Sequence, residues 1–257
     1  MKILPVIKTD RYNLPIAERC KVSWNYFHPD IPMHIVVWED WYDYICEMHQ
    51  TPNVDKVNMA MLVGLFYAIQ KIMVEKYDLL IYLDGDTVIT GRCDELLDGD
   101  YDIAVSRSSD EVLVKFNVGV WASRDLQFIK NFYYTRCVSP VDDNAVFINH
   151  IDNYKWYQKD KVVKVLDTDE SGVWYNERSR EWWNRLSIKD DKLYTPDKQI
   201  KILHWAGGTS WGWEKRMSCS LFSDEVKQWL NKITNTTDFT DYDGEEFGNF
   251  IKDYYKL

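Results

Sequence analysis

Two aspartates flank a single glycine at Asp84, Gly85 and Asp86. Carboxylates separated by one residue can both reach the same divalent cation from a tight turn, and Mg²⁺ and Mn²⁺ prefer oxygen ligands of this kind. Gly85 allows the backbone to bend and a ligand to approach closely. The triplet therefore predicts a site for Mn²⁺ or Mg²⁺ that would also bind a diphosphate.

The pattern is weak on its own, because Asp-x-Asp also occurs at 98–100, 100–102, 167–169 and 241–243. We expect most of these to be solvated turns. Only Asp84 follows a five-residue apolar run, 79–83, that an apolar helix precedes. The triplet is therefore expected at the carboxyl end of a central strand, where α/β sheets bind ligands. Two charges at the rim of a core are costly unless a cation neutralises them.

Strands and helices alternate in the first half of the chain, which predicts an α/β fold with a mostly parallel central sheet flanked by helices. The clearest helix, 58–76, is apolar nearly all round, and its small residues Ala60, Gly64 and Ala68 would let it lie close against a sheet. We expect further helices at 14–27, 125–134, 143–150 and 224–232, and strands at 3–7, 33–38, 79–83, 102–106, 116–123, 162–166 and 200–203.

The chain is expected to form one domain over residues 1–235, followed by a tail over 236–257 that is first acidic and then aromatic. The tail could dock on a partner, close over the site or form a plain terminal helix, and we favour the last. Residues 40–50 are interpreted as loop or short helix, and residues 171–191 show no pattern that assigns a structure.

The composition argues against several classes of protein. A formal net charge of −10 over 257 residues repels nucleic acid phosphates, so no nucleic acid partner is expected. The five cysteines are scattered without a Cys-x-x-Cys pair, which argues against a disulfide framework or a structural zinc site and favours free thiols in the cytoplasm. The N-terminal apolar run is too short for a signal peptide, and the stretch 59–69 is too short for a transmembrane segment.

The segment YDLLIYLDGDTVITGRCDELL resembles the part of GT-A glycosyltransferases that carries the metal-binding motif. It is most similar to the glycogenin-like and bacterial galactosyltransferase-like group, glycosyltransferase family 8, and the resemblance covers roughly residues 1–215 in order. It implies a GT-A type, Rossmann-like sheet. It also implies transfer of a sugar from a nucleotide diphosphate sugar, a UDP-sugar, to a hydroxyl of a glycan or another acceptor, with retention of configuration.

His204 follows the late strand 200–203 and precedes Gly207 and Gly208. A histidine at a strand end can be a third metal ligand beside two aspartates, although a lone histidine more often bonds within a loop. The glycines resemble the family's His-x-x-Gly-x-x-Lys motif, which favours the metal ligand. Lys215 stands further along than the family's lysine, and it either neutralises the leaving diphosphate or is a surface lysine.

By the same resemblance, Asn117 and Gly119 line the pocket of the donor sugar; the alternative for Gly119 is close packing against the metal loop. Asp143 and Asn144 match a family position that contacts hydroxyls of the donor or the acceptor, and Asp143 is the candidate base if the reaction inverts. Both residues also suit a helix N-terminus, where Asp142 competes with Asp143 as the N-cap.

The nucleobase is expected near the end of the first strand, where Thr9, Asp10 and Tyr12 are the candidates and Tyr12 could stack on the base. Any turn carries residues of these types. Arg107 follows the strand 102–106 and would hold the sugar or a phosphate, or else is an exposed charge.

Two other functions use similar features. A nucleotidyltransferase shares the aspartate and metal chemistry but needs a glycine-rich loop after its first strand, and residues 7–11 contain no glycine. A non-catalytic carbohydrate-binding protein on the same fold would suit the 12 tryptophans and 17 tyrosines.

Overall fold

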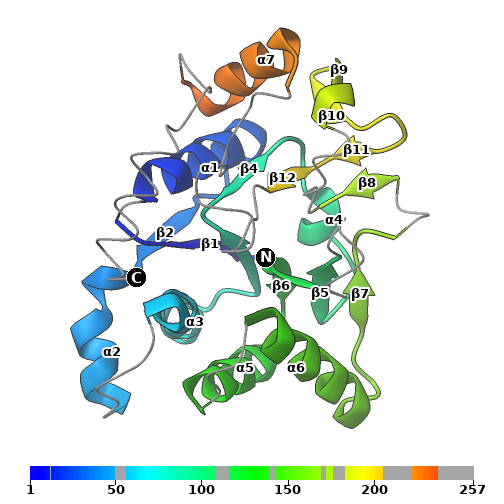
Figure 1. The fold of residues 1–257 in the computed structure, drawn as a ribbon. Coiled ribbons are helices and arrows are strands. Elements are labelled where there is room, and N and C mark those ends of the chain that lie inside the picture. Colours follow the sequence, from blue (N-terminus) through cyan, green and yellow to red (C-terminus); the bar gives the residue numbers. More distant parts are fainter. Residues whose placement is uncertain are drawn as a thin grey trace.

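The computed structural model describes residues 1–11, 13–49, 56–107, 116–138, 143–168, 172–175, 183–204 and 222–236. Its centre is a six-stranded sheet in the order β2-β1-β3-β6-β5-β7 (Figure 1). The strands are β1 (Ile3–Thr9), β2 (His34–Val37), β3 (Leu79–Asp84), β5 (Ile103–Ser106), β6 (Asn117–Ser123) and β7 (Val163–Val165). Only β6 runs antiparallel to its neighbours among these strands, so the sheet is mostly parallel, as predicted.

Strand β3 lies in the middle of the sheet, paired with β1 on one side and β6 on the other. Its residues from Leu79 to Leu83 are all buried, which explains their continuous apolar run. Because β1, β3, β5 and β7 share one direction, their carboxyl ends lie at the same edge of the sheet. This edge, which we call the carboxyl edge, includes Asp84 and the first residue of the antiparallel β6.

Helices cover both faces of the sheet (Figure 1). One face carries α3 (Lys56–Glu75), α5 (Leu126–Val138) and α6 (Asp143–Tyr157), with α2 (Tyr42–His49) and the 3-10 helix η1 (Trp38–Asp40) packed into the same core. The other face carries α1 (Leu14–Phe27) and the short α4 (Asp94–Leu97). A Cβ added to Gly64 of α3 would collide with the hydroxyl of Tyr82 on β3, so this glycine brings the helix close to the sheet.

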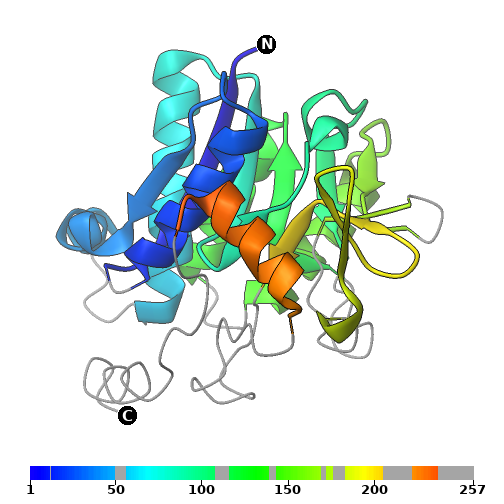
Figure 2. The same ribbon diagram turned by 90° about the horizontal axis from the view of Figure 1, so that it is seen from above.

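Two small sheets and a helix lie on the same face of the central sheet as α1. Strands β4 (Thr87–Ile89) and β12 (Ile202–His204) form an antiparallel pair. The four-stranded sheet contains, in order, β8 (Val173–Trp174), β11 (Gln199–Ile200), β10 (Lys192–Tyr194) and β9 (Ser187–Lys189), and η2 (Trp183–Arg185) precedes β9. Helix α7 (Asp224–Thr234) lies across α1, as Figure 2 shows.

Most elements agree with the sequence-based expectations, and the differences are informative. Strand β1 continues through Lys8 and Thr9, beyond the expected range 3–7, and α6 continues to Tyr157, beyond the expected range 143–150. The region 171–191 contributes β8, η2 and β9. No helix within the described residues is long and apolar enough to cross a membrane. The single-domain boundary, the nature of the tail and the cytoplasmic location stay predictions.

Candidate metal and donor site

The two aspartates of the central triplet lie where β3 ends and the chain turns into β4. Asp84 is the last residue of β3, and Thr87 begins β4. The hydroxyl of Thr87 donates a hydrogen bond to the carbonyl oxygen of Asp84, with 2.8 Å between the oxygens. This bond closes the turn, so that both carboxylates are held at the carboxyl edge of the sheet.

His204 reaches this turn from a distant part of the sequence. Strand β12 pairs antiparallel with β4 in a register that sets His204 opposite Thr87. The Nε2 atom of His204 lies 3.2 Å from Oδ1 of Asp86 and 3.7 Å from Oδ2 of Asp84. One ligand atom from each of the three residues lies within 4.8 Å of the others. The structure thus brings together the three predicted metal ligands.

The space and the chemistry of this cluster fit a divalent cation. Two carboxylates and one imidazole form a donor set that Mn²⁺ accepts. Gly119 on β6 faces the cluster: a Cβ at this position would lie 2.6 Å from Cε1 of His204 and would also collide with Oδ2 of Asp84. Any side chain at position 119 would therefore displace the proposed ligands.

Asn117, Gly119 and Asn144 lie at the same edge, held by local hydrogen bonds. The backbone N–H of Gly119 donates to Oδ1 of Asn117 at 2.7 Å, and that of Val118 donates to Oδ1 of Asn144 at 3.0 Å. Asn144 therefore joins the start of α6 to the start of β6. Helix α6 begins at Asp143, but the side chains of Asp142 and Asp143 lie outside the described part of the chain.

Thr9 and Asp10 adjoin the metal loop. A Cβ added to Gly85 would lie 3.3 Å from Oγ1 of Thr9, so the glycine permits this close approach. The Asp10 carboxylate accepts hydrogen bonds from the backbone N–H of Asn13 at 2.6 Å and from its side-chain amide at 2.7 Å. Asp10 thus fixes the turn into α1. The other expected residues, Tyr12, Gly207, Gly208 and Lys215, lie outside the described residues.

Lys8 is a member of this cluster that the sequence analysis missed. The register of the parallel pair β1 and β3 sets Lys8 beside Asp84. Its Nζ atom lies 3.2 Å from Oδ1 of Asp84, and only 13% of its side chain is exposed. The sequence contained a signal, since an apolar strand that continues through one lysine requires a partner for that charge.

Arg107 and Asp167 lie further along the carboxyl edge, after β5 and β7. Asp167 is 1% exposed, and its carboxylate accepts a hydrogen bond from the backbone N–H of Tyr175. Burial raises the pKa of Asp167 to about 7, against the opposite influence of the N–H groups of Tyr175 and Arg107. The expectation of a solvated turn is therefore wrong at Asp167. The sequence contained a signal, since Asp167 directly follows the expected strand 162–166, which is apolar apart from Lys164.

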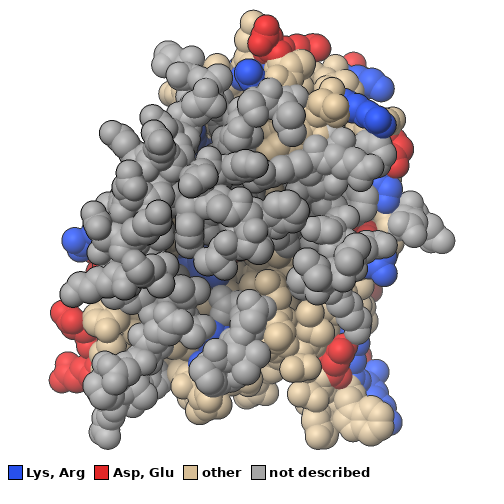
Figure 3. Space-filling view, in the orientation of Figure 1, with Lys and Arg blue, Asp and Glu red and all other residues tan. Residues whose placement is uncertain are grey.

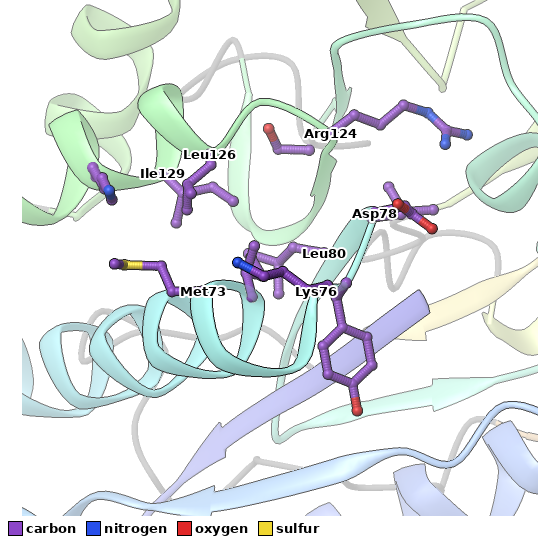
Figure 4. Close-up of a pocket in the computed structure, with 12 residues that line it drawn as sticks. Met73, Lys76, Asp78, Leu80, Arg124, Leu126 and Ile129 are labelled. Carbon is purple, nitrogen blue, oxygen red and sulfur yellow. The ribbon is translucent and has the colours of Figure 1, made fainter. Parts of the chain in front are cut away.

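A hollow of about 570 Å³ lies at the opposite edge of the sheet, between the end of α3 and the start of α5 (Figure 4). Met73, Leu80 and Ile129 give it an apolar lining, and Lys76 and Arg124 stand at its sides. The length of β3 separates it from Asp84 by about 17 Å.

On the face shown in Figure 3, basic and acidic side chains of the described residues intermix around the margin.

No protein-family model and no curated protein sequence matches the chain. Solved structures match it in fold. A glycosyltransferase involved in the glycosylation of the major capsid of PBCV-1 superposes with a TM-score of 0.53 at 10% sequence identity, over 82% of this chain and 96% of that one. The chain has the GT-A fold.

A second match to the GT-A fold is the glycosyltransferase GlyE of Streptococcus pneumoniae TIGR4. Its TM-score is 0.52 at 11% identity, and the match covers 99% of this chain but 64% of GlyE. The chain thus spans less than two thirds of the length of GlyE. In both comparisons the likeness is one of backbone architecture.

Proposed function

We propose that this protein is a metal-dependent glycosyltransferase that moves a sugar from a nucleotide diphosphate sugar, a UDP-sugar, to a hydroxyl of a glycan or another acceptor. The observation that carries the proposal is the convergence of Asp84, Asp86 and His204 at the carboxyl edge of a GT-A sheet. Ligands of such sheets bind at this edge. The two similar structures are themselves glycosyltransferases, and the sequence motifs favour the glycogenin-like group, family 8.

Different residues at the carboxyl edge would bind different parts of the donor. Asp84, Asp86 and His204 would hold Mn²⁺ or Mg²⁺, which supplies positive charge to the leaving diphosphate when it is bound. Thr9 and Asp10 would contact the nucleoside from the end of β1. Asn117 and Asn144 present polar groups beside Gly119, where the donor sugar would lie.

The acceptor hydroxyl would attack the anomeric carbon as the bond to the diphosphate breaks. We favour retention of configuration, for which the chain needs no dedicated base. An inverting reaction would need one, and Asp143 is the candidate. Arg107 and Lys215 are candidates for contacts with the sugar and the diphosphate.

The test is a panel of UDP-sugars and GDP-sugars, scored for donor hydrolysis and for transfer with Mn²⁺ present or removed by EDTA. We expect turnover of a UDP-sugar that requires the metal and that Asp86→Ala abolishes. The matched control is Asp98→Ala, which changes an exposed aspartate of another Asp-x-Asp pattern. Full activity of Asp86→Ala would contradict the metal site. If UDP shows no metal-dependent binding and no donor is turned over, a non-catalytic carbohydrate-binding protein would be favoured.

A further inference from the structure

Lys8 places a fixed positive charge inside the proposed metal site. Its Nζ atom lies 3.2 Å from Oδ1 of Asp84, while Oδ2 of the same carboxylate faces His204. The two oxygens of Asp84 therefore meet two different partners. One oxygen forms an ion pair with an ammonium group, and the other is directed to the position that the cation would occupy.

The surroundings of Lys8 hold its ammonium in this place. Its stem passes Gly64 of α3, where an added Cβ would lie 3.2 Å from Cβ of Lys8. Its Nζ atom lies 4.0 Å from the sulfur of Met61 and 5.9 Å from the centre of the Tyr82 ring. A lysine that is mostly buried retains its charge at an acceptable cost only when a carboxylate is close. Residues of β1, β3 and α3 together therefore fix the position of the Lys8 ammonium group.

We propose that Lys8 is a resident cation of the donor site, which weakens the binding of the divalent metal and strengthens the binding of a nucleoside diphosphate to the metal-loaded site. The inference rests on the proposed function, because it assigns a role within the same site. Lys8 acts on the metal through Asp84 and through its charge, so it is a positioning residue.

The charges of the site determine the sign of both effects. Two aspartates alone would balance a divalent ion beside a neutral imidazole. With Lys8 present, the loaded site has one excess positive charge, which attracts a diphosphate. In the empty site, the same ammonium shares the charge of Asp84 and repels an incoming cation. Removal of Lys8 should therefore change the two affinities in opposite directions.

The first measurement is titration calorimetry of Mn²⁺ binding to the wild type and to Lys8→Met, which keeps an unbranched side chain without the charge. We expect Lys8→Met to bind Mn²⁺ about tenfold more tightly. The matched control is Lys21→Met, which removes the same charge from a partly exposed lysine that pairs with Glu18 on α1. It should bind Mn²⁺ within about twofold of the wild type, because surface charges are screened.

The second measurement is the affinity for UDP at saturating Mn²⁺. We expect Lys8→Met to bind UDP about tenfold more weakly than the wild type. Lys8→Arg keeps the charge and should restore most of the UDP affinity. Thermal unfolding in EDTA reports whether each variant is folded, and Lys8→Gln replaces Lys8→Met if the latter is not.

The outcomes separate the two proposals. A wild type that binds no Mn²⁺, or an Asp86→Ala variant that binds it normally, would contradict the metal site and hence the proposed function. If the wild type binds Mn²⁺ but Lys8→Met binds it equally or more weakly, the proposed role of Lys8 is wrong and the metal site stands. Unchanged UDP affinity of Lys8→Met would also overturn the role of Lys8.

Discussion

Asp84 and Asp167 occupy equivalent places in the sheet but meet opposite environments. Each lies at the carboxyl end of a strand of the same direction: Asp84 is the last residue of β3, and Asp167 comes two residues after the end of β7. The carboxylate of Asp84 is 22% exposed and lies beside Lys8 and His204. Asp167 is 1% exposed, and burial raises its pKa to about 7. An acid at a strand end therefore becomes a candidate ligand only when the neighbouring elements supply charge and leave space.

The chain that follows each aspartate produces this difference. After Asp84 it turns through Gly85 into β4, which pairs with β12 and so brings His204 to the turn. Gly119 on the neighbouring strand keeps the space open. After Asp167 the chain passes into β8, and the backbone of Tyr175 covers the carboxylate. The first arrangement suits a cation, whereas the second buries a single carboxyl group.

The largest expected effect tests this contrast directly. Asp84→Asn should lower the affinity for Mn²⁺ about 100-fold or more, because a neutral amide replaces a charged ligand. Asp167→Asn should leave that affinity within about twofold, since its carboxyl group is enclosed away from the cluster. Calorimetric titration of both variants with Mn²⁺ measures the difference. Equal losses in the two variants would show that Asp167 also supports the metal.

The raised pKa of Asp167 should be visible in the pH dependence of the free energy of unfolding. Its folded pKa of about 7 lies above the ordinary value of about 3.9 for an unfolded aspartate. Between these two pKa values the folded state binds more protons than the unfolded state. The contribution of Asp167 to the free energy of unfolding is therefore present in full below pH 4 and declines as the pH rises to about 7. Between pH 5 and 7 the wild type should lose about 2 kcal/mol relative to Asp167→Asn.

Urea denaturation of both proteins at these two pH values provides the measurement. Subtracting the free energy of unfolding of Asp167→Asn from that of the wild type removes the contributions of all other titrating groups. A difference between wild type and Asp167→Asn that is constant with pH would mean that Asp167 is ionised in the folded protein at pH 5.

A smaller effect is expected at Gly119. The methyl group of Gly119→Ala would press on the ring of His204 and on Asp84. If His204 and Asp84 shift to make room for this methyl group, the site should bind Mn²⁺ about tenfold more weakly, because the ligand positions are disturbed. The affinity is measured together with the unfolding midpoint in EDTA, which detects general damage to β6. Normal Mn²⁺ affinity with an unchanged midpoint would show that the cluster does not need this space.

The smallest effect concerns the turn between β3 and β4. Thr87→Val removes the hydroxyl that donates to the carbonyl oxygen of Asp84 while it keeps the shape of the side chain. We expect a loss of about 1 kcal/mol in the free energy of unfolding. Thermal or urea unfolding in EDTA measures it without a contribution from metal. Thr135→Val is the control, because the half-buried Thr135 on α5 also donates its hydroxyl to a backbone carbonyl oxygen, that of Asn131, away from the metal cluster.

Much of the fold and part of the site could be predicted from the sequence. Apolar runs and helical patterns indicated an α/β fold, the bounds of α1 and the place of Asp84 at the end of β3, because these features depend on neighbouring residues. His204 was identified through a motif resemblance, since nothing near it in sequence relates it to Asp84. The expected roles of Asp143, Lys215, Tyr12, Gly207 and Gly208 stay predictions.

Only the tertiary structure decided which side chains meet. The antiparallel course of β6, the position of Lys8 beside Asp84 and the burial of Asp167 all depend on pairing between strands far apart in the chain. A local pattern determines whether a segment is a strand, because side chains alternate or are buried along it. It does not determine the neighbouring strand or the register, and these decide whether an aspartate at a strand end faces a cation or lies enclosed.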